Sequence, residues 1–335
     1  MHLRRPYGGG VPKSMRLAAS MLLVLGTVCG ACAPSAPTVA PPRLPAGAAG
    51  KVLSRAIAAA GGWERWMALR DVAYVNTLDL LDPDGNVMSE SIGWYSALLH
   101  NGMQARIESI GLPTEVSLAA RGADTWGLRN DTPILEAPRL ELARFNLVSN
   151  LFWLSLPFAL AEMPATVTDQ GTVTGEGGVQ WQRLKVVFDA GNPAVPGEWF
   201  VLYINDKTGL IDRVHARLTA SFLRQELWVG KWLDYREWDG LKKERRRRFF
   251  PADDNGEIIG ALVADQLVEH VHFNNGYGPE RFRRPAKAAG AAQAARIADC
   301  DASSCFRARA NGSPRPPGEG QRDVSSTACG GATLW

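Results

Sequence analysis

Residue types that carry out covalent chemistry are sparse in this sequence and form no catalytic pattern. The chain has no G-x-S-x-G nucleophile elbow, no H-E-x-x-H zinc motif and no phosphate-binding P-loop. His270 and His272 fall on one face of an expected strand beside Glu269, but no third ligand follows at a spacing typical of a metal site. We therefore expect a protein that is not an enzyme and that uses no metal or cofactor.

The chemistry that the sequence does indicate is acylation near the N-terminus. Met15-Arg16 is a short basic region, residues 17–28 are apolar, and Cys29 and Gly30-Ala31-Cys32 follow. This layout is typical of an export signal and is too short for a comfortable transmembrane helix. Gly30-Ala31-Cys32 resembles the end of a bacterial lipobox, although Cys29 stands where Leu or Val is usual. We expect lipidation of Cys32; the alternative is an ordinary cleaved signal peptide with a spare thiol.

Three further cysteines lie near the other end of the chain, at Cys300, Cys305 and Cys329. In an oxidising envelope Cys300 and Cys305 could form a disulfide, which would leave one thiol over. None of the three stands in a pattern typical of catalysis.

A run of cations stands between residues 242 and 248, in the order Lys-Lys-Glu-Arg-Arg-Arg-Arg, on an expected strand. One interpretation is contact with anionic lipid headgroups, worth roughly 1 kcal/mol for each surface cation. The residues expected in that contact are Lys242, Lys243, Arg245 and Arg247. The alternative is a solvated edge strand that its charges protect from further pairing. The chain's net charge of +3 is mild, so neither composition nor export supports a nucleic-acid partner.

The cationic run belongs to a region, residues 179–250, that is rich in Val, Ile, Trp, Tyr and Phe and is divided by turns. The loop Asp206–Gly209 closes a hairpin, with Gly where a positive φ costs little. We expect strands at Val179–Ala190, Glu198–Asn205, Leu210–Thr219, Leu227–Tyr235 and Leu241–Phe250.

The same pattern extends to both sides of this region. Short helices are predicted at Val52–Ala60 and Trp63–Leu69. Before the central region the expected strands are Asp71–Leu81, Met88–Leu99, Met103–Ile110, Glu115–Ala120 and Thr125–Leu128. After it they are Glu257–Leu262 and Gln266–Phe273.

The expected sheet is apolar on both faces, because Phe200, Leu202 and Ile204 alternate with Trp199, Val201 and Tyr203. Both faces must therefore be covered. Residues 137–160 supply a helix that is apolar nearly all round from Phe145 onward and ends or kinks at Pro157. This helix is expected either to plug the sheet as a core element or to lie as a lid over a lipid cavity.

Composition divides the chain into four parts. Residues 1–32 are the predicted signal, and residues 33–50 are an Ala/Pro-rich tether with almost no apolar bulk. Residues 51–285 form the expected domain. Residues 286–335, rich in Ala, Gly, Pro, Arg and Ser, are expected to be largely disordered.

The order of elements resembles the outer-membrane lipoprotein-sorting carriers of the LolA/LolB/LppX-like superfamily, over Val52–Phe273. Three strings carry the resemblance: a helix ending Ala60-Gly61-Gly62-Trp63, an apolar helix ending Leu156-Pro157-Phe158, and the hairpin Leu202–Ile211. The resemblance implies a mainly β (α+β) fold, a strongly curved antiparallel sheet or incomplete β-barrel wrapped around helices. It also implies a hydrophobic cavity for acyl chains of a lipid or lipoprotein. No residue carries over one to one, so the substrate does not transfer.

From these observations we expect a cell-envelope lipoprotein that binds a lipid or an acylated protein. Acylation would anchor it to a membrane, the outer rather than the inner, with the domain facing the periplasm. The alternative is a non-transporting scaffold or lipid-sensing regulator of the same fold with an envelope protein partner. The apolar residues expected to line the cavity are Val72, Tyr74, Leu78, Ile92, Trp94, Phe152, Trp153, Phe158, Phe200, Leu202, Trp228 and Trp232.

Overall fold

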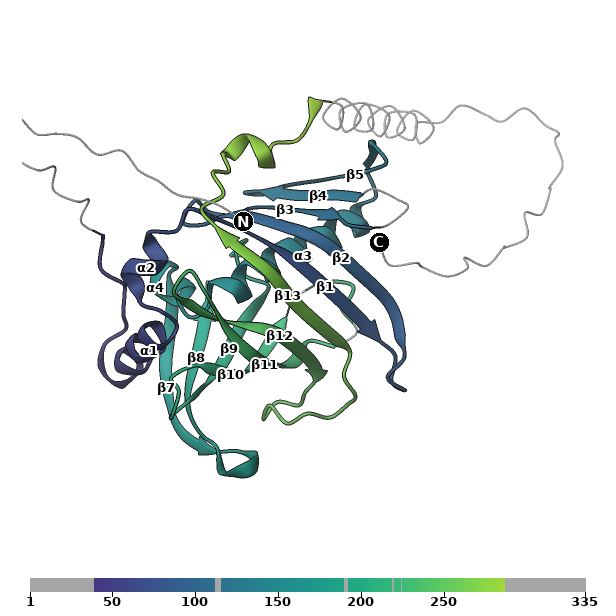
Figure 1. The fold of residues 1–335 in the computed structure, drawn as a ribbon. Helices are drawn as coiled ribbons and strands as arrows, with labels where there is room; N and C mark the ends of the chain where they lie inside the picture. The colour runs from purple at the N-terminus through teal and green to yellow at the C-terminus, as the bar shows by residue number, and fades with distance from the viewer. Residues whose placement is uncertain (1–38, 112–115, 190–191, 219, 224, 287–335) are drawn as a thin grey trace, which may run out of the picture. The chain divides into compact units, whose positions relative to one another are not determined.

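A computed structural model describes residues 39–111, 116–189, 192–218, 220–223 and 225–286 of the chain (Figure 1). The predictions for Cys32, for the three later cysteines and for the tail after 286 lie outside these residues. No helix of the described residues is long and apolar enough to cross a membrane.

Thirteen strands of the described residues form one antiparallel sheet, in the order β6-β5-β4-β3-β2-β1-β13-β12-β11-β10-β9-β8-β7. The first and last strands of this order, β6 and β7, are the two edges. The strands are β1 Asp71–Leu81, β2 Val87–Leu98, β3 Gln104–Ser109, β4 Val116–Arg121, β5 Asp124–Arg129, β6 Thr132–Ile134, β7 Ala165–Thr174, β8 Gln180–Phe188, β9 Gly197–Asn205, β10 Ile211–Leu218, β11 Leu227–Trp238, β12 Leu241–Pro251 and β13 Ala264–Phe273.

The sheet curves strongly around α3 (Ala137–Ser155), as Figure 1 shows. Side chains from both halves of the sheet reach this helix: Tyr95 of β2 donates a hydrogen bond to the carbonyl of Leu147, and Phe200 of β9 lies 4.8 Å from Phe152, centroid to centroid. The predicted fold class, a mainly β chain whose curved antiparallel sheet wraps a helix, is therefore confirmed.

There are three shorter helices, α1 Gly47–Ala59, α2 Trp63–Met67 and α4 Ala159–Glu162, and each contributes side chains to the same buried core as α3. Two 3-10 turns are found at Glu176–Gly178 and Pro279–Phe282. α1 ends at Gly61-Gly62, whose φ angles of 120° and 92° are ones that side chains with a Cβ rarely adopt. α3 ends before Pro157, which cannot continue a helix because it lacks a backbone N–H.

The sequence missed two strands and predicted one that is absent. β6 and β7 are the sheet edges, and β7 is largely exposed, so its Thr-rich sequence carries little of the apolar alternation by which strands are recognised. The strand expected at 257–262 is wrong: the described backbone there forms a single bridge, Ala252–Ile258.

The tether prediction also needs correction at its end. α1 begins at Gly47, four residues before the predicted domain start at Lys51. The segment before it is attached as well, because Arg43 N donates to Ala161 O at 3.1 Å and Trp63 Nε1 donates to Ala40 O at 2.6 Å. The folded part of the chain therefore begins inside the stretch that composition assigned to a stalk.

Candidate functional site

The interior beneath α3 is filled by aromatic rings. Phe152 and Trp153 of α3 are 2% and 3% exposed. Phe152 lies 5.7 Å from Phe188, and Trp153 lies 5.4 Å from Trp232 and 6.3 Å from Phe249, measured between ring centroids. Edge-to-face arrangements dominate these contacts, which is the geometry that aromatic pairs prefer. The sheet and the helix therefore bury one group of aromatic side chains, called here the ring cluster: Phe152, Trp153, Phe188, Phe200, Trp232 and Phe249.

Hydrogen bonds between polar side chains attach the middle of α3 to the face of the sheet that the helix covers. The amide oxygen of Asn150 accepts hydrogen bonds from the Tyr74 hydroxyl at 3.1 Å and from Gln266 Nε2 at 2.8 Å. Gln266 Nε2 also donates to Asn76 Oδ1 at 2.6 Å. Burial raises the pKa of Tyr74 far above its ordinary value, so its hydroxyl remains a neutral donor. Asn150 thus joins the helix to β1 and β13 at one point.

A buried ion pair continues this network into β12. Arg247 Nε donates to Glu244 Oε1 at 2.7 Å and Arg247 Nη1 donates to Gln266 Oε1 at 3.2 Å. The side chains of Arg247 and Glu244 are 0% and 2% exposed. Lys243 is buried beside them and donates from Nζ to the carbonyl of Leu156, at the end of α3. Burial lowers the pKa of Lys243 to about 8, with Glu244 acting in the opposite direction.

The first turns of α3 are held by surface loops. Ser221 N and Oγ donate to the Glu141 carboxylate at 2.9 and 2.8 Å. These two hydrogen bonds hold the pKa of Glu141 below its ordinary value. Arg144 donates to Gly122 O at 2.9 Å, and Phe145 packs edge-to-face on Phe222 at 5.3 Å. We call this end of the interior the mouth; its partly exposed apolar side chains are Phe145, Val195, Phe222, Leu223 and Trp228.

The predicted cavity residues divide between the two faces of the sheet. Strand pairing puts Tyr74 opposite Tyr95, and both side chains reach α3. Trp94 is opposite Val75 and Ile92 is opposite Thr77, and these positions are an odd number of residues from Tyr95 and Tyr74, so their side chains point to the other face. Ile92 and Trp94 are therefore on the face away from α3, contrary to expectation. The others lie on the α3 side or on α3–α4 itself: Val72, Tyr74, Leu78, Phe152, Trp153, Phe158, Phe200, Leu202, Trp228 and Trp232.

The four cations predicted to contact lipid headgroups do not lie on one surface. Lys243 and Arg247 are buried, and Arg245 is paired with Asp234 and Glu269. Lys242 is exposed. The edge-strand alternative is also wrong, because β12 pairs with β11 on one side and β13 on the other. The charges are accommodated by buried and cross-strand partners rather than by solvent alone.

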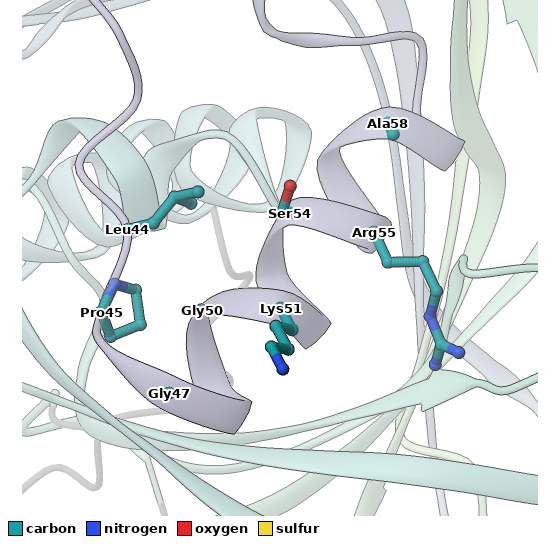
Figure 2. A pocket seen from close by; sticks show the side chains of 8 residues that line it. All are labelled: Leu44, Pro45, Gly47, Gly50, Lys51, Ser54, Arg55 and Ala58. Atoms are coloured by element: carbon teal, nitrogen blue, oxygen red, sulfur yellow. The ribbon is translucent and has the colours of Figure 1, made fainter.

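Pockets of the described residues open elsewhere. One, of about 550 Å³, is a groove lined by residues of α1 and by Leu44 and Pro45 before it (Figure 2). Arg55 of this groove pairs with Asp206 at 2.8 Å. Another, of about 570 Å³, lies between the turns at 101–104 and 121–124 and the segment 282–284. Neither is lined by the ring cluster. His270 and His272 belong to no group of three metal-ligating side chains among the described residues.

Sequence reasoning missed the polar members of the site. Asn150 and Ser149 stand among apolar residues in the second half of α3, and Gln266 stands near the start of β13. A polar residue inside an apolar helix is a signal for a buried hydrogen bond. That signal was present in the sequence, but its partners on β1, β12 and β13 are far away along the chain.

Comparison with known proteins gives matches in structure alone. No family model and no curated protein sequence matches the chain. The similar solved structures include a putative outer membrane lipoprotein-sorting protein domain from Vibrio parahaemolyticus, at 13% identity and a TM-score of 0.42, over 70% of this chain and 95% of that one.

A LolA superfamily protein from Nitrosomonas europaea matches at 12% identity and a TM-score of 0.45, over 70% of this chain and 96% of that one. A DUF1329 family protein from Desulfovibrio piger matches with the same identity, TM-score and coverage. The superfamily that the order of elements indicated is represented among the similar structures.

Proposed function

We propose that this protein is an envelope lipoprotein that binds the acyl chains of a lipid or of an acylated protein between α3 and the curved sheet, in lipid or lipoprotein trafficking to the outer membrane. The observation that carries the proposal is the ring cluster. Phe152, Trp153, Phe200 and Trp232 form an apolar lining, buried to 3% exposure or less, on and against the second half of α3.

The free energy of burying an acyl chain is larger than that of the hydrogen bonds that hold the first turns of α3. Burying about 15 methylenes releases on the order of 12 kcal/mol at about 0.8 kcal/mol each. The contacts at the mouth are two hydrogen bonds from Ser221 to Glu141, three from Arg144 to Gly122, Thr125 and Pro193, and one ring pair, Phe145–Phe222. At about 0.5–1.5 kcal/mol for each hydrogen bond, the five contribute roughly 2.5–7.5 kcal/mol, which is less than the acyl chain releases. The first half of α3 is therefore the segment that would swing away, while Asn150 keeps the second half attached.

The second part of the proposal is a membrane anchor formed by acylation. Acylation at Cys32 would tether the domain to a membrane facing the periplasm, and residues 33–38 would link it to the folded segment that begins before α1. A single acyl chain gives only marginal membrane binding, whereas two or more hold a protein stably. Residues 1–32 as signal and residues 286–335 as a tail without its own core remain predictions. The protein would need no cofactor and carry out no catalysis.

The proposal is tested by native mass spectrometry of the protein purified from membrane-containing cells, followed by lipid extraction. We expect one acyl species in near-stoichiometric amount. Phe222→Ala and Glu141→Gln should speed the uptake of a fluorescent fatty acid, because each loosens the mouth. Val187→Ala is the matched control, since Val187 is also an exposed apolar residue, 41% exposed, but lies away from the mouth on β8. A protein that is empty as purified and takes up no fatty acid would overturn the proposal.

A second candidate is a non-transporting scaffold or lipid-sensing regulator. The close contacts within the ring cluster favour it, because centroid separations of 4.8–5.8 Å among Phe152, Phe188 and Phe200 describe a filled interior. An empty protein that co-purifies with an envelope partner would support this candidate. Binding of a fatty acid with displacement of α3 would exclude a merely structural interior.

A further inference from the structure

The interior beneath α3 carries polar hydrogen-bonding groups that the fold leaves unused. Trp232 Nε1, Ser149 Oγ and Arg247 Nη2 are buried and make no hydrogen bond within the described part of the protein. Arg247 Nη2 is 2.6 Å from Glu244 Oε1 in the ion pair, but its N–H does not donate to that oxygen. A buried donor without an acceptor costs roughly 1–3 kcal/mol, so such groups are expected to have a partner.

The three groups converge on one place. Trp232 and Arg247 are directly opposite each other across β11 and β12. Ser149 is one helical turn before Trp153 on the same face of α3, and Trp153 packs edge-to-face on Trp232 at 5.4 Å. Two donors from the sheet and a hydroxyl from the helix therefore line the same part of the interior, next to the ring cluster.

The charge of this part of the interior is positive. The buried ionisable side chains of β12 are two cations, Lys243 and Arg247, and one carboxylate, Glu244. Their balance leaves one positive charge in excess on β12: Lys243 donates to the carbonyl of Leu156 at the end of α3, and Arg247 is paired with Glu244. An anionic oxygen group would supply both the missing acceptors and the missing charge.

The direction of α3 indicates how such a ligand would lie. Phe145, Ser149 and Trp153 are spaced four residues apart and so share one face of the helix, with Phe145 at the mouth and Ser149 one turn further inside. A chain that follows this face from Ser149 to Phe145 runs from the polar group toward the opening. The charged end would therefore be innermost and the hydrocarbon end would point to the mouth.

We propose that the interior binds a single-chain fatty acid with its carboxylate inward, held by Trp232 Nε1, Ser149 Oγ and Arg247. This inference rests on the proposed acyl-binding function and names its ligand class. A phospholipid or an acylated protein cannot enter in this orientation, because its bulky head would have to pass the mouth first. Glu244 and Gln266 hold the guanidinium in place and leave Nη2 free to donate to the ligand.

Calorimetry with three probes of equal chain length tests the inference: palmitate, hexadecanol and methyl palmitate. We expect palmitate to bind the wild-type protein at least tenfold more tightly than either neutral probe. Trp232→Phe keeps the ring and removes the N–H, and Ser149→Ala removes the hydroxyl; each should weaken palmitate about tenfold or more, as for one hydrogen bond to a charged group. Each should weaken hexadecanol less than palmitate, because a hydrogen bond to a neutral hydroxyl is weaker than one to a carboxylate. Trp199→Phe, on the opposite face of the sheet beside His215, is the matched control.

Carboxyl-labelled ¹³C palmitate supplies a second readout. Bound at this site, its carboxyl should titrate below the pKa of the same probe in micelles, because Arg247 favours the charged form. Equal binding of palmitate and hexadecanol, or Trp232→Phe without effect on palmitate, would overturn the inference and leave acyl binding intact. Failure of all three probes to bind would overturn the proposed function together with the inference.

Discussion

Removing Arg247 should expose the energetics of the buried ion pair most clearly. Arg247→Met leaves Glu244 in an interior where it is 2% exposed and has lost the guanidinium that neutralises it. Breaking one partner of a buried pair costs about 3–5 kcal/mol. The total stability of a domain is about 5–15 kcal/mol, so this loss is a large part of it. For a domain of this size the melting temperature should fall by roughly 10 °C.

Urea unfolding followed by tryptophan fluorescence measures the cost, and the chain supplies its own control. Arg248 is the next residue in β12, pairs with Asp265, and has a side chain that is 37% exposed. Arg248→Met should cost only about 0–1 kcal/mol, because solvent screens an exposed pair. The double variant Arg247→Met/Glu244→Leu should recover at least half of the loss. Equal costs for the two single variants, or no recovery in the double variant, would refute the burial argument.

Three further predictions address pH, packing and anchoring. Burial lowers the pKa of His100, but its bonds to Glu162 and to backbone carbonyls outweigh this and leave the pKa raised. The pair's contribution to stability should therefore be complete below the ordinary histidine pKa of about 6.5 and be lost as pH rises through the raised value. Unfolding free energies measured across that interval should show this slope, and Glu162→Gln should remove it. Phe152→Ala should cost about 3–5 kcal/mol in urea unfolding, against about 0.5 kcal/mol or less for Val187→Ala; a cost below 1 kcal/mol would contradict close packing of the ring cluster. Cys32→Ser should abolish incorporation of labelled palmitate and release the protein from membranes; continued labelling would place acylation elsewhere.

Local patterns predicted the central strands well because their information is local. β1 begins and ends at Asp71 and Leu81 as expected, since apolar and β-branched residues run up to the Asp-Pro-Asp-Gly turn. α3 was predicted from its helical spacing and from Pro157. The strand expected at 257–262 does not form. The prediction was based on a short apolar run and did not include the preceding Gly256, whose φ of 80° is that of a tight turn.

The candidate site was predicted in its apolar part and missed in its polar part. Phe152, Trp153 and Trp232 were expected inside because large aromatic residues are seldom left in water. Ile92 and Trp94 were assigned to the wrong face, since alternation tells which residues share a face but not which face the helix covers. The side that α3 covers is fixed by contacts between residues far apart in sequence.

The sequence by itself determined most of the strands, the helix that becomes apolar from Phe145 onward and the absence of a catalytic motif, because these depend on neighbouring residues alone. Tertiary structure decided the fate of the cationic run. The pairing of β12 between β11 and β13 turned Arg247 inward to Gln266 and Arg246 outward to Asp265. Glu244 is turned inward as well, against simple alternation, where the ladder with β11 is interrupted at Asp234, whose φ is 54°. Whether a charge in a strand meets solvent or a buried partner depends on which strands flank it and which face is covered. Those are properties of the whole sheet and not of any stretch of the chain.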